Sequence, residues 1–193
     1  MPPVDRSKLD SVAAVRERLG VGDEHLAVFH GHYDHPPNCE AAKLIDDRIA
    51  PAVRKRGVDV EFLLVGKNPP AVSSPNVHSI GFVEDLFSVL NAADVAIVPI
   101  LHGGGTKTKL YDYISLALPM VATEKAIEGV ELVPDRHVLI AEESEFVSSL
   151  KFLLRNRNTR LYFSEQLNTL SNNWTWNRSA DSLSRAYHIF RNA

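Results

Sequence analysis

The segment DVAIVPILHGGGTKTKLYDYISLALPMVAT, residues 94–123, decides the fold. An apolar run ends at Pro99–Ile100, and three consecutive glycines follow it. A helical pattern comes next, with Leu110 and Ile114 on one face. A second apolar run, residues 120–123, follows at once. Because parallel strands need a crossover connection, the order strand, loop, helix, strand predicts neighbouring strands of a parallel sheet.

The same alternation extends to both sides of this segment. We expect strands at residues 26–31, 58–66, 77–81, 95–100, 120–123 and 138–141. We expect helices at residues 38–50, 84–92, 106–117, 143–155, 159–170 and 176–190, with Pro51 breaking or kinking the first near its end. Nearly continuous apolar strands indicate a sheet that is covered on both faces. The predicted fold class is therefore α/β: a doubly wound, mostly parallel, six-stranded Rossmann-like sheet with a C-terminal helical tail.

Composition narrows the classes of function. The 193 residues, 45% of them hydrophobic, suit one globular domain. The 21 Lys and Arg against 24 Asp and Glu give a net charge of −3, which argues against nucleic-acid and polybasic membrane binding. The apolar runs are too short to cross a bilayer, and the N-terminus lacks the apolar core of a signal peptide. The lone Cys39 excludes an internal disulfide, so we expect a cytoplasmic protein.

The glycine segment has the chemistry of a phosphate site. Glycines at 103–105 allow a phosphate to approach the backbone, and a helix that opens at Thr106 offers N–H groups. Lys107 and Lys109 add positive charge, and Asp112 lies about 9 Å along the helix, within reach of ribose hydroxyls. Since ligands of open parallel sheets bind beyond the carboxyl ends of the strands, the segment predicts a nucleotide diphosphate site. The alternative is a solvated loop with Thr106 as a helix cap. The segment is neither a Walker loop nor a GxGxxG fingerprint.

The segment 103–123, GGGTKTKLYDYISLALPMVAT, resembles a pattern of family-4 retaining glycosyltransferases, G-x-G-T-R-x-K-x-x-E-x-x-x-x-G-x-P-V-V-A. These enzymes have the two-domain GT-B fold. The similarity covers about residues 15–190, with the blocks in the family's order. The further blocks are HYDHPPNCEAAKLI (32–45), GFVEDLFSVLNAADVAIVPI (81–100), AIEGVELVPDRHVLIAEESEFVSSLKFLL (126–154) and NWTWNRSADSLSRAYHIF (173–190).

The resemblance implies the C-terminal, donor-binding domain of such an enzyme. Residues 15–193 would be that domain and residues 1–14 its lead-in, with the N-terminal acceptor domain absent from this chain. The implied activity is retaining transfer of a sugar from a UDP- or GDP-sugar, with no metal or other cofactor. The acceptor domain would be supplied in cis or by a partner subunit, and the isolated chain would be inactive without it. That domain would also bring any association with the inner face of the membrane.

The resemblance also assigns roles to residues. The backbone at Gly103, Gly104, Gly105 and Thr106 would hold the diphosphate, with help from Lys107 and Lys109. Asp112 takes the place of the family's ribose-binding glutamate and is one methylene shorter. We therefore expect Lys107 and Asp112 to be the catalytic residues in this chain.

Other segments would complete the donor site. The backbone at Phe82 and Val83 would contact the base, and Glu128 would border the pocket. The turn at Gly31 would approach the phosphates. His32 stands where many members have an arginine, and it would be a weaker, pH-dependent substitute.

A competing interpretation comes from HGHYDH, residues 30–35, which matches the H-x-H-x-D-H signature of metallo-β-lactamase-fold hydrolases. Such an enzyme would bind one or two zinc ions and activate a hydroxide. The short preceding segment and Pro36–Pro37 argue against it, and a polar loop facing the cleft explains the residues more simply. A noncatalytic nucleotide-binding module also stays open. The zinc ligands would be His30, His32, Asp34 and His35, joined by His102, Asp112 or His137.

Overall fold

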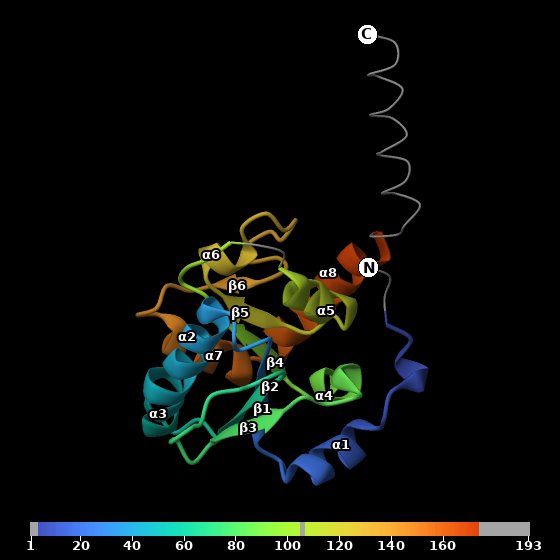
Figure 1. Cartoon of the computed structure of the whole chain (residues 1–193). Coiled ribbons are helices and arrows are strands. Elements are labelled where there is room, and N and C mark those ends of the chain that lie inside the picture. Colours follow the sequence, from blue (N-terminus) through green and yellow to red (C-terminus); the bar gives the residue numbers. More distant parts are fainter. Residues whose placement is uncertain (1–3, 105–106, 174–193) are drawn as a thin grey trace.

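The protein is described by a computed structural model that covers residues 4–104 and 107–173 (Figure 1). The strands are β1 (His25–His30), β2 (Val60–Val65), β3 (Val77–Gly81), β4 (Val95–Val98), β5 (Met120–Ala122) and β6 (Leu139–Ile140). The α-helices are α1 (Val12–Leu19), α2 (Pro36–Leu44), α3 (Ala50–Lys55), α4 (Leu86–Asn91), α5 (Thr108–Ser115), α6 (Glu124–Ile127), α7 (Phe146–Arg155) and α8 (Arg157–Asn173). A short 3-10 turn, Arg6–Lys8, precedes α1.

All pairings between these strands are parallel, in the order β3-β2-β1-β4-β5-β6. This confirms the predicted six-stranded Rossmann-like sheet. The chain leaves β1 toward β2 and β3, and it returns to the other side of β1 at β4. The carboxyl ends of β1 and β4 therefore form the point at which the strand order reverses, which is where open α/β sheets bind ligands.

Helices cover both faces of the sheet. In Figure 1, α2, α3 and α7 lie on one side, and α1, α4 and α5 lie on the other. The strands are buried because both faces are covered, and Phe29 and Phe62 fill the centre from β1 and β2. Tyr113 from α5 is also fully buried there. The sheet thus forms a rigid frame for the loops that follow its strands.

Two expected elements begin or end elsewhere. The strand predicted at 95–100 ends at Val98, because Pro99 has no N–H for the ladder. The helix predicted to open at Thr106 begins at Thr108, with Lys107 as its N-cap. The predicted cap Thr106 lies outside the described residues.

Pro51 was expected to break or kink its helix, and it does not break it. A π-helical segment, Ile45–Ile49, links α2 to α3, and the chain stays helical to Lys55. Pro51 lies in the first turn of α3, where its missing N–H is tolerated. Asp46 in the π-helical segment accepts hydrogen bonds from the backbone N–H groups of Ser73 and Ser74 and anchors the irregular loop before β3.

The C-terminal part is helical, as predicted. Helices α7 and α8 contact each other, and α8 also packs against α5. The helix expected at 176–190, with Trp174 and Trp176 before it, lies outside the described residues. The proposed boundary after residue 14 stays a prediction, although α1 runs across it. Among the described helices, none combines the length and apolar character that a bilayer crossing requires.

Candidate functional site

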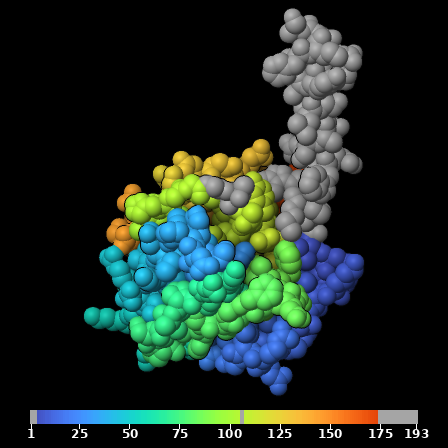
Figure 2. All heavy atoms as spheres, in the orientation of Figure 1, coloured from blue at the N-terminus to red at the C-terminus, as the bar shows by residue number. Residues whose placement is uncertain are grey.

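A cavity of about 680 Å³ opens at the carboxyl ends of β1, β2, β3 and β4. In Figure 2, the segment after β1 (light blue), the segment before α4 (green) and the segment after β4 (yellow-green) meet on the visible face. The cavity therefore lies at the point where the strand order reverses. The lining residues include His30 of β1, Gly31 and His32 of the turn after it, and Asn38 of α2. The loop after β4 contributes His102, Gly104 and Lys107, and the start of α5 contributes Thr108 and Lys109.

Glycines bring the turns after β1 and β2 together. The N–H of Gly31 donates to the carbonyl oxygen of Val65 at 2.9 Å. Gly66 has φ +130°, and a Cβ atom there would lie 2.0 Å from the carbonyl oxygen of Gly31. A Cβ on Gly31 would lie 2.9 Å from the side chain of Asn38. The predicted phosphate turn at Gly31 therefore packs this closely against its neighbours only because Gly31 and Gly66 both lack side chains.

The loop after β4 approaches α2 just as closely. Gly103 has φ +100°, and a Cβ atom there would lie 2.6 Å from Cγ of Pro37. The loop then enters α5 at Lys107, whose side chain gives no capping hydrogen bond because an ammonium group cannot accept one. A helix start without such a cap offers N–H groups to an anion. Gly104 lines the cavity, whereas Gly105 lies outside the described residues.

Lys109 lies against α2 and β1 at the wall of the cavity. Its Nζ donates to Oδ1 of Asn38 at 2.8 Å and lies 5.2 Å from the ring centre of Phe29. Burial, and then repulsion from Lys107, lowers the pKa of Lys109 to about 8. A bound anion would favour the charged form of this ammonium group.

Asp112 and His30 face each other at the inner end of the cavity. The Asp112 Oδ2 atom lies 3.4 Å from His30 Nε2. Burial lowers the pKa of His30 to about 3, with a further contribution from the charge of Lys109, so the ring is neutral and the contact is not an ion pair. Burial raises the pKa of Asp112 to about 6. His30 lines the cavity, whereas Asp112 lies beside it with 19% of its side chain exposed.

The imidazole of His32 is oriented at the cavity mouth by the next loop. Its Nε2 lies 2.8 Å from Oδ2 of Asp34, and the Asn68 side chain donates to both oxygens of Asp34. Hydrogen bonds from Asn68 and His32 lower the pKa of Asp34. His32 therefore lines the cavity with its ring held by Asp34 and, through Asp34, by Asn68 of the loop after β2, while its role as a substitute for an arginine stays a prediction.

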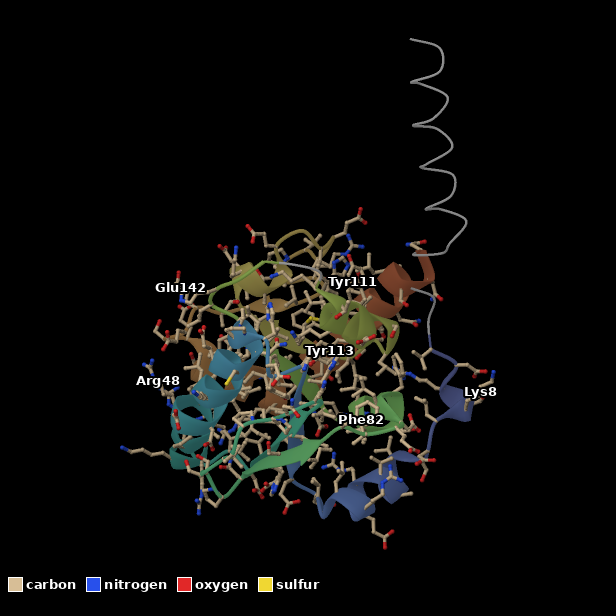
Figure 3. The ribbon with its side chains drawn as sticks, viewed as in Figure 1. Lys8, Arg48, Phe82, Tyr111, Tyr113 and Glu142 are labelled. Atoms are coloured by element: carbon tan, nitrogen blue, oxygen red, sulfur yellow. The ribbon has the colours of Figure 1, made fainter. Side chains whose placement is uncertain are left out.

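The segment after β3 forms the opposite rim. Phe82 and Val83 line the cavity together with Glu84 and Leu86. The side chain of Phe82 is 77% exposed and extends from the end of β3 in Figure 3, while Tyr113 points from α5 toward the strands. The carboxyl end of β3 thus gives the cavity one large apolar surface at its entrance.

Glu128 was expected to border the pocket, and it is not among the residues that line this cavity. Its carboxylate pairs with Nζ of Lys125 at 2.5 Å, and the carbonyl oxygen of Lys125 accepts a hydrogen bond from Nζ of Lys107. The charge of Lys107 also contributes to lowering the pKa of Glu128, after the hydrogen bond and charge of Lys125. Glu128 is connected to the site through these lysines.

Comparison with known families supplies the classification. Residues 24–156, more than half of the chain, match the model of the family described as "Glycosyl transferases group 1". The chain belongs to the group 1 glycosyl transferases. A comparison with curated proteins gives no significant match.

Solved glycosyltransferases share the fold of this group 1 chain. Sucrose-phosphate synthase of Thermosynechococcus elongatus superimposes with a TM-score of 0.72 at 15% identity, over 100% of this chain and 52% of that protein. Anabaena HepE, solved in complex with UDP and glucose, gives 0.70 at 13% identity, over 90% and 51%. The C-terminal domain of a group 1 protein from Francisella tularensis gives 0.59 at 12% identity, over 90% and 94%. The chain spans about half the length of the first two proteins.

The zinc-hydrolase interpretation of residues 30–35 has no support in this group 1 glycosyl transferase. Across residues 4–104 and 107–173, no three His, Cys, Asp or Glu side chains are grouped to hold a metal ion. His32 faces Asp34, while His30 faces Asp112. His137 accepts a hydrogen bond at Nδ1 from the N–H of Val133, outside the cavity lining.

Sequence reasoning does not identify several residues of the cavity as donor-site candidates. It assigns His30, His35 and His102 only as metal ligands, although each lines the cavity. It includes Asn38 only as part of a family block, and it gives no role to Gly66 or Thr108. The position of Gly66 at the end of a predicted strand next to β1 is the signal that could have identified it.

Proposed function

We propose that this chain is the donor-binding half of a retaining glycosyltransferase, and that its cavity binds a UDP- or GDP-sugar. One observation carries the proposal: the glycine turn after β1, Lys107, Lys109 and the start of α5 surround one cavity where the strand order reverses. This arrangement suits a diphosphate, since backbone N–H groups and two ammonium groups line the same cavity. The structure of HepE with UDP and glucose, which has the same fold, supports a uridine nucleotide as the first to test.

In the proposed reaction, the positively charged groups of this chain stabilise the leaving group. When the anomeric bond breaks, negative charge develops on the departing nucleoside diphosphate, and preorganised donors stabilise it. Lys107 would contact the diphosphate directly, and the N–H groups of the first turn of α5 would add partial positive charge. His32 would donate to a phosphate oxygen from the opposite wall. In this proposal the basic residues take the place of a divalent metal.

Asp112 would accept hydrogen bonds from the ribose, and the backbone at Phe82 and Val83 would contact the base. The acceptor and the closure that excludes water would come from a second domain, in cis or on a partner subunit. We therefore propose that the chain alone binds the nucleotide sugar and does not transfer the sugar.

Calorimetric titration with UDP and with GDP, up to about millimolar nucleotide, tests the site. Replacing Lys107 with alanine removes one charged hydrogen bond and should weaken binding roughly ten- to a hundredfold. Lys55→Ala is the matched control, because Lys55 is exposed at the end of α3, away from the cavity lining. If neither nucleotide binds, or if Lys107→Ala and Lys55→Ala behave alike, the assignment of this cavity is wrong.

A further inference from the structure

The side-chain nitrogen Nε2 of His30 is a buried polar atom beside the cavity. Nε2 is buried and has no hydrogen-bond partner among the described residues. The ring is held in place, because the backbone N–H of His30 donates to Oη of Tyr113 at 3.1 Å and the two rings pack edge to face at 5.0 Å. A buried polar atom without a partner is rare in native proteins. Its presence beside a cavity therefore indicates a contact that forms when the cavity is occupied.

The acceptor that faces this atom is Asp112. Its Oδ2 atom lies 3.4 Å from Nε2, a few tenths of an ångström beyond an ordinary N–H···O distance. Because the His30 ring is neutral, only one of its nitrogens carries a proton. The ring also has a hydrogen-bond contact with the backbone of Lys109, and the carboxylate that faces Nε2 favours the Nε2–H form.

We infer that His30 is a positioning residue for Asp112: its Nε2–H donates to the Asp112 carboxylate and fixes it, ionised, toward the hydroxyl groups of a bound ribose. The inference rests on the proposed function and adds to it a residue that sequence comparison did not assign. It also explains how an aspartate serves where the family has a glutamate. The histidine ring supports the shorter side chain from below, so one carboxylate oxygen contacts His30 and the other is available to the ligand.

Several groups control the charge of Asp112. His30 faces it from β1, and Lys109 and Tyr113 lie near it on α5. Lys109 favours the ionised carboxylate, while burial disfavours it. The hydrogen bond from His30 adds to the effect of Lys109. Removing that bond should therefore raise the pH below which the carboxylate becomes protonated and loses its ribose contact.

Three variants test this role. His30→Phe keeps a ring against Tyr113 and removes the donor, whereas His30→Gln keeps an N–H at about the same distance from the backbone. His25→Phe is the matched control, since His25 lies at the other end of β1 and faces Asp94 at 3.7 Å. Each variant is titrated with UDP and with 2′,3′-dideoxy-UDP, or with the guanosine pair if GDP is the nucleotide that binds.

The wild-type chain should bind the ribonucleotide about tenfold more tightly than the dideoxynucleotide, the range of a hydrogen bond to a charged group. In His30→Phe this ratio should fall close to one, and the midpoint of the acid loss of UDP affinity should move to higher pH. His30→Gln should restore most of the ratio, and His25→Phe should keep it. A full ratio and an unshifted midpoint in folded His30→Phe would overturn the inference while nucleotide binding itself stands. No binding of either nucleotide by the wild type would overturn the proposed function, and the inference with it.

A measurement on the wild type covers the case in which His30→Phe does not fold. Nitrogen-15 spectra of the imidazole report which ring nitrogen is protonated. We expect the Nε2–H form of His30, with the proton moving downfield when UDP binds. An Nδ1–H form in both states would leave Asp112 without this donor and would contradict the inference.

Discussion

Lys109 Nζ donates to Asn38 Oδ1 at 2.8 Å, and this contact joins the first turn of α5 to the first half of α2 across the cavity wall. Both partners line the cavity. The ammonium group is thus held by a neutral amide and by the face of Phe29, and no carboxylate of the described residues forms an ion pair with it. Such a group is ready to neutralise an anion.

The first prediction concerns proton uptake by Lys109. The pKa of about 8 is raised when a diphosphate binds nearby, so UDP binding near pH 8 should take up a fraction of a proton. Calorimetry in two buffers of different ionisation enthalpy measures this uptake. The variant Lys109→Met should bind more weakly and without the uptake, whereas Lys55→Ala should retain it.

The same shifted pKa of Lys109 should also affect how the free energy of unfolding depends on pH. Its folded pKa of about 8 lies below the ordinary value of 10.5, so between these values the unfolded chain binds more protons. The free energy of unfolding should therefore rise as pH increases over this range. Urea unfolding at pH 7.5 and 9.5 should show a smaller rise in Lys109→Met. An equal rise in both proteins would contradict the assigned environment of Lys109.

The ionised carboxylate of Asp112 should lower the free energy of unfolding. Its folded pKa of about 6 exceeds the ordinary 3.8, so its contribution to the free energy of unfolding falls as pH rises from about 4 to 6 and stays low above that. Asp112→Asn should raise the free energy of unfolding at pH 7 by at most about 3 kcal/mol, since one pKa unit corresponds to about 1.4 kcal/mol. The gain should vanish near pH 4, and UDP binding should weaken at pH 7. A loss of stability at pH 7 would refute this account.

Gly66 is predicted to be irreplaceable in the turn after β2. An alanine there would place Cβ 2.0 Å from the carbonyl oxygen of Gly31 at φ +130°. Strain and overpacking together should lower the free energy of unfolding by about 3 kcal/mol or more. Gly57→Ala is the control, because Gly57 also has positive φ, +66°, but a Cβ atom there would meet no described atom within 4 Å. It should cost only about 1 kcal/mol, and similar losses from both variants in urea unfolding would count against the close approach.

Ala117 should gain from becoming glycine. It has φ +45° after the end of α5, a conformation that costs a side-chain-bearing residue about 1–2 kcal/mol. After subtraction of the backbone entropy of glycine, Ala117→Gly should raise the free energy of unfolding by about 0.5–1 kcal/mol. Ala52→Gly, inside α3, should lower it by about the same amount. Thermal unfolding of the two variants should therefore shift in opposite directions.

The sequence predicted the frame of the site better than its interior. The six strands, their parallel arrangement and a site at their carboxyl ends follow from the alternation of apolar runs and helical patterns, because short-range periodicity and parallel crossovers restrict the topology. The family pattern quoted in the sequence analysis has a glycine at the position of Ala117, and this glycine indicated a left-handed turn there. Features of this kind depend on residues that are close together in the sequence, so they can be predicted from it.

Contacts between distant segments were not predictable. The pairs His30–Asp112 and Lys109–Asn38 each join residues more than 70 positions apart, and no periodicity links them. The π-helical segment before Pro51 also lacked a signal in the sequence, and the continuation of the helix past Pro51 was not expected, because a proline ordinarily ends a helix.

The segments that line the cavity lie at the carboxyl ends of the strands. The amino ends of the strands, on the opposite side of the sheet, are therefore suitable places to attach a label or a tether. The connections at residues 20–24, 56–59 and 92–94 lie just before β1, β2 and β4, at the far end from the cavity. A fluorophore or a surface tether attached at the exposed Gly57 would report on, or immobilise, the chain without obstructing nucleotide entry. Binding sensors built on this domain should therefore be anchored from that edge.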